Sequence, residues 1–208
     1  MARLTGRYAM MEQLVAEGVR YVFGNPGTTE QAFIDALQDY PQIEYNLALQ
    51  ESVAIGVADG YARASGRSAF VQLHIMPGLG NAMGMLYNSY RTHTPLVIYA
   101  GQHPQRGASQ EPILAGDLVR LAEPLTKWAV EAQDANEIPV LLRRAFKVAM
   151  EPPRGPVFLS VPTNVMDEDC DAEITPSAPA DTRVRADPSA VARVALVVVV
   201  VTLSVVPR

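Results

Sequence analysis

Three loops in the first half of the chain carry the side chains best suited to chemistry. The first contains Asn25-Pro26-Gly27, the second contains Glu51, and the third begins at His74. A carboxylate and an imidazole held near one another can exchange protons with a bound molecule as general acid and base. We therefore take these three loops as the candidate site.

Each loop follows a short apolar segment of the kind that forms a buried strand, and helical patterns follow. The three predicted strands cover residues 21–23, 43–49 and 69–73, and a small, apolar helix is expected from about Glu51 to Ser65. Parallel strands deliver their following loops to one edge of the sheet, where ligands bind. The sequence therefore predicts that residues 24–28, Glu51 and His74 share one rim.

The same alternation of strand and helix continues to Pro162. Further strands are predicted at residues 96–100, 127–130 and 156–161, and further helices at residues 8–18, 80–90 and 138–149. Such alternation indicates a parallel sheet that is covered on both sides. The predicted fold class is α/β, with a six-stranded parallel sheet and helices on both faces.

The composition and charge of the chain indicate a folded protein and disfavour some kinds of partner. The chain has 208 residues, of which 49% are hydrophobic and 19% charged, so it can bury a core. A net charge of -5 without a basic run argues against nucleic acid or a membrane as a partner. Residues 1–15 contain no signal-type apolar stretch, which favours a cytoplasmic protein. Cys170 is the single cysteine and lies among acidic residues, so we expect a solvated, inert thiol.

Taken singly, the candidate residues have structural explanations. Glu51 could be a carboxylate that the helix dipole stabilises at a helix start, and His74 could be a structural histidine. The glycines of Gly78-Leu79-Gly80-Asn81-Ala82-Met83-Gly84 could pack a helix against the sheet or bind a dinucleotide. The acid that such a turn needs on the next strand is missing, which disfavours a nicotinamide or flavin site. No set of residues has the spacing of metal ligands.

Together, the motifs resemble a known family. They are Phe23-Gly24-Asn25-Pro26-Gly27-Thr28-Thr29-Glu30, Leu49-Gln50-Glu51, Ala58-Asp59-Gly60-Tyr61-Ala62-Arg63, Leu73-His74, Gly80-Asn81-Ala82-Met83-Gly84 and Thr94-Pro95-Leu96-Val97. This set is similar to the N-terminal, pyrimidine-binding domain of thiamine-diphosphate-dependent enzymes. The benzoylformate decarboxylase and acetolactate synthase group is the most similar.

The resemblance implies roles for individual residues. Glu51 matches the glutamate that hydrogen-bonds the pyrimidine ring of thiamine diphosphate and activates the cofactor. Asn25, Pro26 and Gly27 match the loop that approaches the cofactor, and His74 matches a histidine that transfers protons. Thr28 stands where benzoylformate decarboxylase has a serine that contacts the substrate carboxylate. Ile75 departs from that enzyme, which has serine after its histidine.

The resemblance also implies a division of the chain. Residues 1–163 are expected to form the pyrimidine-binding domain and residues 164–190 a linker. Residues 191–208 are expected to be the abortive start of a central domain or a frameshifted tail. The family binds the diphosphate and its Mg²⁺ through a C-terminal domain with Gly-Asp-Gly and Asn-Asn motifs, which this sequence lacks. We therefore expect a truncated chain with half a site.

Two functions follow from these expectations. In the first, the chain supplies the pyrimidine half-site of a 2-oxo acid decarboxylase or carboligase and is inactive alone. Its partners would then be a small 2-oxo acid and either another copy, in a homo-oligomer, or a separate diphosphate-domain chain. In the second, the chain is a non-catalytic interaction module of the same fold.

Overall fold

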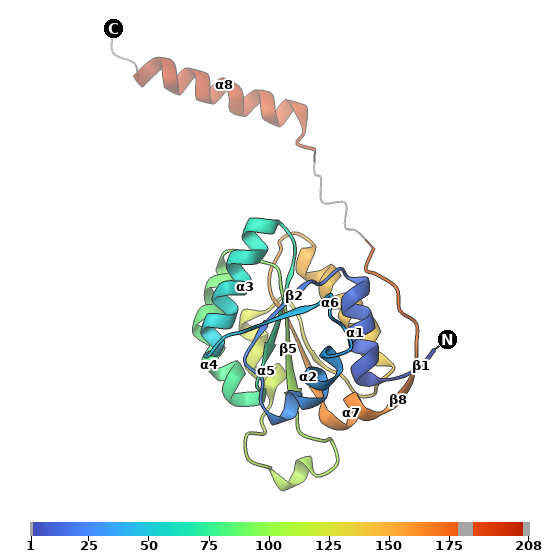
Figure 1. Cartoon of the computed structure of the whole chain (residues 1–208). Coiled ribbons are helices and arrows are strands. Elements are labelled where there is room, and N and C mark those ends of the chain that lie inside the picture. The colour runs from blue at the N-terminus through green and yellow to red at the C-terminus, as the bar shows by residue number, and fades with distance from the viewer. Residues whose placement is uncertain (1, 179–184, 206–208) are drawn as a thin grey trace.

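A six-stranded, fully parallel sheet forms the centre of the molecule in the computed structural model, which describes residues 2–178 and 185–205 (Figure 1). The strand order is β3-β2-β4-β5-β7-β6. The bounds are β2 Tyr21–Gly24, β3 Glu44–Leu47, β4 Ala69–Leu73, β5 Leu96–Gln102, β6 Ala129–Glu131 and β7 Val157–Pro162. The predicted fold class is confirmed.

Helices cover both faces of this sheet. On one face lie α1 (Gly6–Ala16), α2 (Gln31–Leu37) and α6 (Glu137–Met150), and their apolar side chains form one buried cluster with the sheet. On the other face lie α3 (Glu51–Ser65), α4 (Ile75–Arg91) and α5 (Leu118–Ala122), which form a second cluster. Short 3₁₀ turns occur at η1 (Thr28–Glu30), η2 (Ala108–Gln110) and η3 (Glu123–Leu125).

The central strands explain why the two clusters exist. In β5, Val97 and Tyr99 belong to the first cluster, whereas Ile98 and Ala100 belong to the second. Successive strand residues point to opposite faces, so an unbroken apolar run is what a strand buried on both sides requires. The sheet is therefore a rigid platform for the loops at its carboxyl edge.

The helix after His74 begins earlier than predicted. We expected residues 75–79 to form a glycine-rich loop, but α4 starts at Ile75. Pro77 is compatible with this start because it lies in the first turn, where a missing backbone N–H costs no intrahelical hydrogen bond. The nitrogen of Gly78 lies 2.6 Å from the carbonyl oxygen of His74, which closes the turn. Gly78, Gly80 and Gly84 consequently lie inside the helix.

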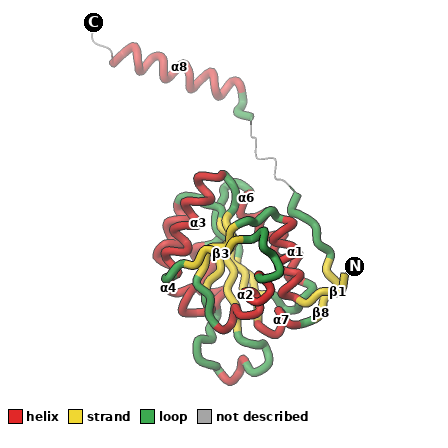
Figure 2. The backbone as a smooth tube through the Cα atoms, in the orientation of Figure 1, coloured by secondary structure: helices red, strands yellow, loops and turns green. Residues whose placement is uncertain are grey.

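The two ends of the sheet domain are joined in a way that sequence analysis missed. Strand β1 (Ala2–Thr5) pairs antiparallel with β8 (Asp169–Ala172), which follows the short helix α7 (Thr163–Asp167). Figure 2 shows this pair beside α1. The segment expected to be a linker from residue 164 thus begins with regular structure, since Val165 and Met166 bury their side chains in the core.

Cys170 corrects a second expectation, because its side chain is buried rather than solvated. It packs with Ala9 and Ala135 in a small cluster next to α1. Burial is the main reason that the pKa of its thiol is raised, and the neighbouring Asp171 and Asp169 carboxylates add to this. The expectation of low reactivity agrees with a raised pKa, since the thiolate is the reactive form.

Residues 188–205 form the helix α8 (Pro188–Val205). The valine-rich run that begins at Val197 has the composition of a strand, but the structure continues the helix through it to Val205. Among the residues that the structure describes, no helix meets the length and apolarity needed to cross a membrane.

Candidate functional site

The three candidate loops meet at the carboxyl edge of the sheet, as predicted. Asn25 follows β2, Glu51 follows β3 and His74 follows β4. The side-chain nitrogen of Asn25 donates a hydrogen bond to Oε1 of Glu51 at 3.1 Å. A Cβ atom added to Gly78 would lie 3.2 Å from Cβ of His74 and 3.3 Å from Oε1 of Glu51, so this glycine lies between the two residues.

Glu51 is the first residue of α3, and two amides hold its carboxylate. Asn25 donates to Oε1, and Nδ2 of Asn81 donates to Oε2 at 3.1 Å. The preceding residue, Gln50, caps the helix by accepting hydrogen bonds from the nitrogens of Ser52 and Val53. A carboxylate has about four lone-pair positions. Glu51, although only 6% exposed, can therefore accept further hydrogen bonds.

His74 is paired with a carboxylate that sequence analysis did not single out. Its Nδ1 lies 2.9 Å from Oε2 of Glu30. Glu30 ends the η1 turn and is completely buried. The nitrogen of Gly27 donates to the same Oε2 at 2.9 Å. The cofactor-binding loop predicted around Gly27 is thus tied to the histidine through one carboxylate.

Three more donors converge on the other oxygen of Glu30. Oε1 accepts hydrogen bonds from the hydroxyl of Thr29 at 2.7 Å, the nitrogen of Gly101 at 2.8 Å and the nitrogen of Ile75 at 3.2 Å. These donors come from η1, from the end of β5 and from the first residue of α4. Glu30 therefore connects three loops of the rim.

The sequence carries a local signal for Glu30. Thr28 and Gln31 have the spacing of a capping box, in which a residue at the helix start and one three positions later bond each other's backbone, and Gly27 and Glu30 have the same spacing. The side chain of Thr28 makes no capping hydrogen bond. The bond between Glu30 and the nitrogen of Gly27 has the same spacing and fills that role.

Glycine at position 27 is required by the histidine. A Cβ atom there would lie 2.0 Å from Nδ1 of His74, a distance that no real contact allows. The histidine ring therefore packs directly on the backbone of this loop.

Ile75 lies beside the site but turns its side chain away from it. Its φ of 28° is in the left-handed region, which β-branched residues rarely adopt. The side chain is fully buried in the cluster formed with α3 and α4. Backbone strain of this kind persists where surrounding contacts fix the residue. Here it places the Ile75 nitrogen against Glu30. The Ile75 side chain, which replaces the serine of benzoylformate decarboxylase, therefore does not lie at the rim surface.

The two threonines of the η1 turn have different surroundings. Thr28, the predicted substrate-binding residue, is exposed and lines a surface pocket with Arg7 and Thr163. Thr29 is buried, and its hydroxyl oxygen lies 3.3 Å from Nδ1 of His74. Thr29 thus contacts the histidine, and the substrate-binding role of Thr28 stays a prediction.

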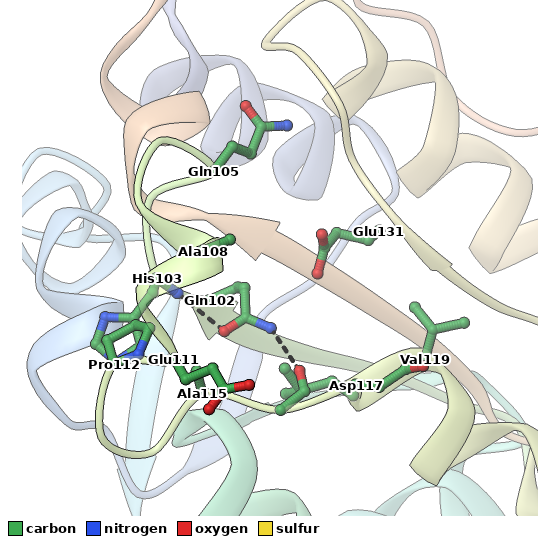
Figure 3. Close-up of a pocket in the computed structure, with 12 residues that line it drawn as sticks. Gln102, His103, Gln105, Ala108, Glu111, Pro112, Ala115, Asp117, Val119 and Glu131 are labelled. Carbon is green, nitrogen blue, oxygen red and sulfur yellow. Dashed lines mark hydrogen bonds between the residues drawn. The ribbon is translucent and has the colours of Figure 1, made fainter.

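A cavity of about 720 Å³ lies beside the rim, under the long segment that follows β5 (Figure 3). The side chains of Gln102 and Glu131 point into it, and Gln102 is held by hydrogen bonds to the backbone of His103 and Gly116. Gly116 packs so closely on Met76 that an added Cβ would overlap it. The wall of the cavity therefore contacts the first turn of α4, next to His74.

Comparison with known proteins identifies the family of this fold. A family profile described as "Thiamine pyrophosphate enzyme, N-terminal TPP binding domain" matches residues 4–121, which is more than half of the chain. The chain belongs to this family. Thiamine pyrophosphate is another name for thiamine diphosphate, so the family supports that cofactor for this domain.

Relatives of this thiamine pyrophosphate enzyme domain include decarboxylases and acetolactate synthases. The benzoylformate decarboxylase of Pseudomonas aeruginosa is 46% identical over 156 residues, which cover 74% of this chain and 29% of that enzyme. The acetolactate synthase large subunit of Haemophilus influenzae is 31% identical over 166 residues, covering 80% and 29%. The chain thus spans less than a third of the length of these relatives.

Solved structures of similar chains support the same family. A putative thiamin diphosphate-dependent enzyme from Mycobacterium smegmatis superposes with a TM-score of 0.84 and 38% identity, over 94% of this chain and 37% of that one. The thiamine diphosphate-dependent 4-hydroxybenzoylformate decarboxylase of Rhodococcus jostii has a TM-score of 0.82 and 33% identity, over 92% and 36%.

Proposed function

We propose that this chain forms the pyrimidine-binding half of the thiamine diphosphate site in a 2-oxo acid decarboxylase or carboligase. The observation that carries the proposal is the carboxylate of Glu51, which two amides orient at the rim while part of its hydrogen-bonding capacity is left unused. A nearly buried carboxylate with free lone pairs is suited to a nitrogen heterocycle, whose ring nitrogen can share a proton with it.

The residues present fit the uncharged end of the cofactor. Asn25, Pro26 and Gly27 would lie against the pyrimidine ring, and Glu51 would bind its nitrogen. The glycines support this fit because they keep the loop, the histidine and the carboxylate close together: Gly27 packs on the His74 ring, and Gly78 lies next to both His74 and Glu51. When bound, the cofactor supplies the electron sink that decarboxylation of a 2-oxo acid needs.

The remaining roles belong to the protein's own side chains. Glu51 would hold a proton between its carboxylate and the ring nitrogen, and the amides of Asn25 and Asn81 would keep that carboxylate in place. His74 would exchange protons with the substrate, and Thr28 would bind the substrate carboxylate. The last role requires the Thr28 hydroxyl to be accessible, which its exposure allows.

The proposal assigns the rest of the site to other chains or segments. The diphosphate and its Mg²⁺ would be held by a diphosphate-binding domain, because Mg²⁺ takes oxygen ligands in a near-octahedral set. Catalysis would then require a homo-oligomer or a separate diphosphate-domain chain. The cytoplasmic location predicted from the sequence remains a prediction.

A chimera tests this proposal. Residues 1–162 would replace the matching segment of the P. aeruginosa benzoylformate decarboxylase, and the product would be assayed with benzoylformate and pyruvate. Thiamine diphosphate-dependent release of CO₂ is expected. A folded chimera that binds the cofactor but releases no CO₂ from either acid would favour the non-catalytic interaction module instead.

A further inference from the structure

We propose that Glu30 is a positioning residue that fixes the tautomer of His74. In this tautomer Nδ1 carries a hydrogen, and Nε2 is the one ring nitrogen able to take up a proton. The geometric argument stands on contacts within this chain alone. The use of Nε2 in catalysis rests on the function proposed above.

The groups around Glu30 are all hydrogen-bond donors, so its carboxylate can act only as a hydrogen-bond acceptor. The backbone nitrogens of Gly27, Ile75 and Gly101 all point hydrogens at it, at 2.9, 3.2 and 2.8 Å. A backbone N–H can only donate. With Thr29 donating as well, a hydrogen on either carboxylate oxygen would face another donor. Glu30 is therefore ionised.

An ionised Glu30 determines what Nδ1 of His74 must be. The acceptors within reach of Nδ1 are Oε2 of Glu30 at 2.9 Å and the hydroxyl oxygen of Thr29 at 3.3 Å. A neutral imidazole has one donor nitrogen and one acceptor nitrogen, and the partner of one nitrogen decides the state of the other. Nδ1 is thus the donor, and Nε2, on the opposite edge of the ring, keeps its lone pair.

The carboxylate is held too firmly to adapt to the other tautomer. Its donors come from residues 27–29, from the start of α4 and from β5, and the backbone of Gly27 packs on the histidine ring without room for a Cβ. A rotation of the imidazole that turned Nε2 toward Glu30 would move the ring into this backbone. The pairing therefore holds Nδ1 against the buried carboxylate, while the side chain of His74 stays 21% exposed.

Nitrogen NMR of the intact chain tests the tautomer directly, without cofactor or activity. The chain has three histidines, so ¹⁵N-histidine labelling gives three ring-nitrogen pairs, assigned with H93Q and H103Q. His103 is an internal control of the opposite kind, since its Nε2 lies 2.8 Å from the carbonyl oxygen of Ile113 and must donate. Spectra are recorded at alkaline pH, so that the imidazole rings are neutral and each carries a single ring hydrogen.

We expect His74 to show a protonated Nδ1 and an unprotonated Nε2, with the reverse at His103. E30Q presents an amide NH₂ to at least two donors, so His74 should shift toward the Nε2-H tautomer while His103 is unchanged. The T29V variant keeps the carboxylate and should retain the native tautomer. If E30Q does not fold, the wild-type and T29V spectra decide. The proposal is overturned if His74 of the wild type has the Nε2-H tautomer, or if E30Q leaves the tautomer of His74 unchanged.

Discussion

Two glutamates at the same rim differ in how completely the protein satisfies them. Glu30 accepts hydrogen bonds from five groups and is entirely buried. Glu51 accepts hydrogen bonds from two side-chain amides and keeps a small exposed fraction. The two carboxylates have the same chemistry, so the difference lies in what the fold supplies around them.

The difference separates a carboxylate that organises the site from one that is available to a ligand. A buried polar group without partners is costly, so the fold provides Glu30 with a full set. An unused lone pair on a nearly buried carboxylate is tolerated where a ligand completes it. The comparison therefore predicts that the same substitution lowers stability far more at Glu30 than at Glu51.

The largest expected effect is the complete absence of turnover in the isolated chain. Under the proposed function, Glu51 and its loop would contact only the uncharged end of thiamine diphosphate, and the phosphates and their metal would need oxygen ligands from elsewhere. Calorimetry with thiamine diphosphate and Mg²⁺, followed by pyruvate and benzoylformate assays, measures this. Micromolar, Mg²⁺-dependent binding or any turnover by this chain alone would contradict it.

The second prediction compares the stabilities of E30Q and E51Q. E30Q should lower the free energy of unfolding by about 3 kcal/mol, because its amide hydrogens face buried donors that lose their acceptor. E51Q should lower it by less than about 1 kcal/mol, since only two amides are affected. Urea denaturation of both variants gives the difference. Equal losses would remove the distinction between the two carboxylates.

The third prediction concerns the contact between the loop and the histidine. G27A should lower the free energy of unfolding by about 2 kcal/mol, because the new methyl group overlaps the His74 ring and forces a backbone shift. G60A is the matched control, since it lies within α3 with nothing near its added Cβ and should raise stability by about 0.5–1 kcal/mol. A neutral G27A would mean that the ring moves freely.

The smallest effect is expected at Tyr99, whose hydroxyl is buried without a hydrogen-bond partner among the described residues. Burial is the main cause that raises the pKa of this phenol well above its usual value, and the charge of Glu30 contributes. Y99F removes an unsatisfied group, so thermal unfolding should show stability unchanged or raised by up to about 1 kcal/mol. A clear loss would reveal a partner of the hydroxyl and an additional contact near Glu30.

The sheet and its rim were predictable because they depend on patterns that the sequence carries directly. Apolar runs of strand length, each followed by a helical period, determine the parallel sheet, and that topology places Asn25, Glu51 and His74 at one edge. The early start of α4 was missed because glycine and proline usually mark a loop. Here they lie in a first helical turn that burial of Ile75 stabilises.

The pairing of β1 with β8 and the contacts of Glu30 were not predicted because both join residues that are far apart in the sequence. Nothing local in residues 2–5 or 169–172 indicates that they pair with each other, since neither segment is an apolar run. The donors to Glu30 are likewise far apart in sequence, with Gly101 separated from it by 71 positions. Spacing rules detect partners within a turn, whereas these contacts exist only after the sheet has formed.

The turnover of E51Q in the chimera with P. aeruginosa benzoylformate decarboxylase tests the central claim most directly. E44Q, an exposed substitution on β3, serves as the control and should keep full turnover. We predict that E51Q lowers turnover by roughly 10²–10⁴-fold, with the unfolding midpoint little changed and cofactor affinity reduced less. Turnover of E51Q near that of the unsubstituted chimera would contradict the claim and leave Glu51 as a carboxylate at a helix start.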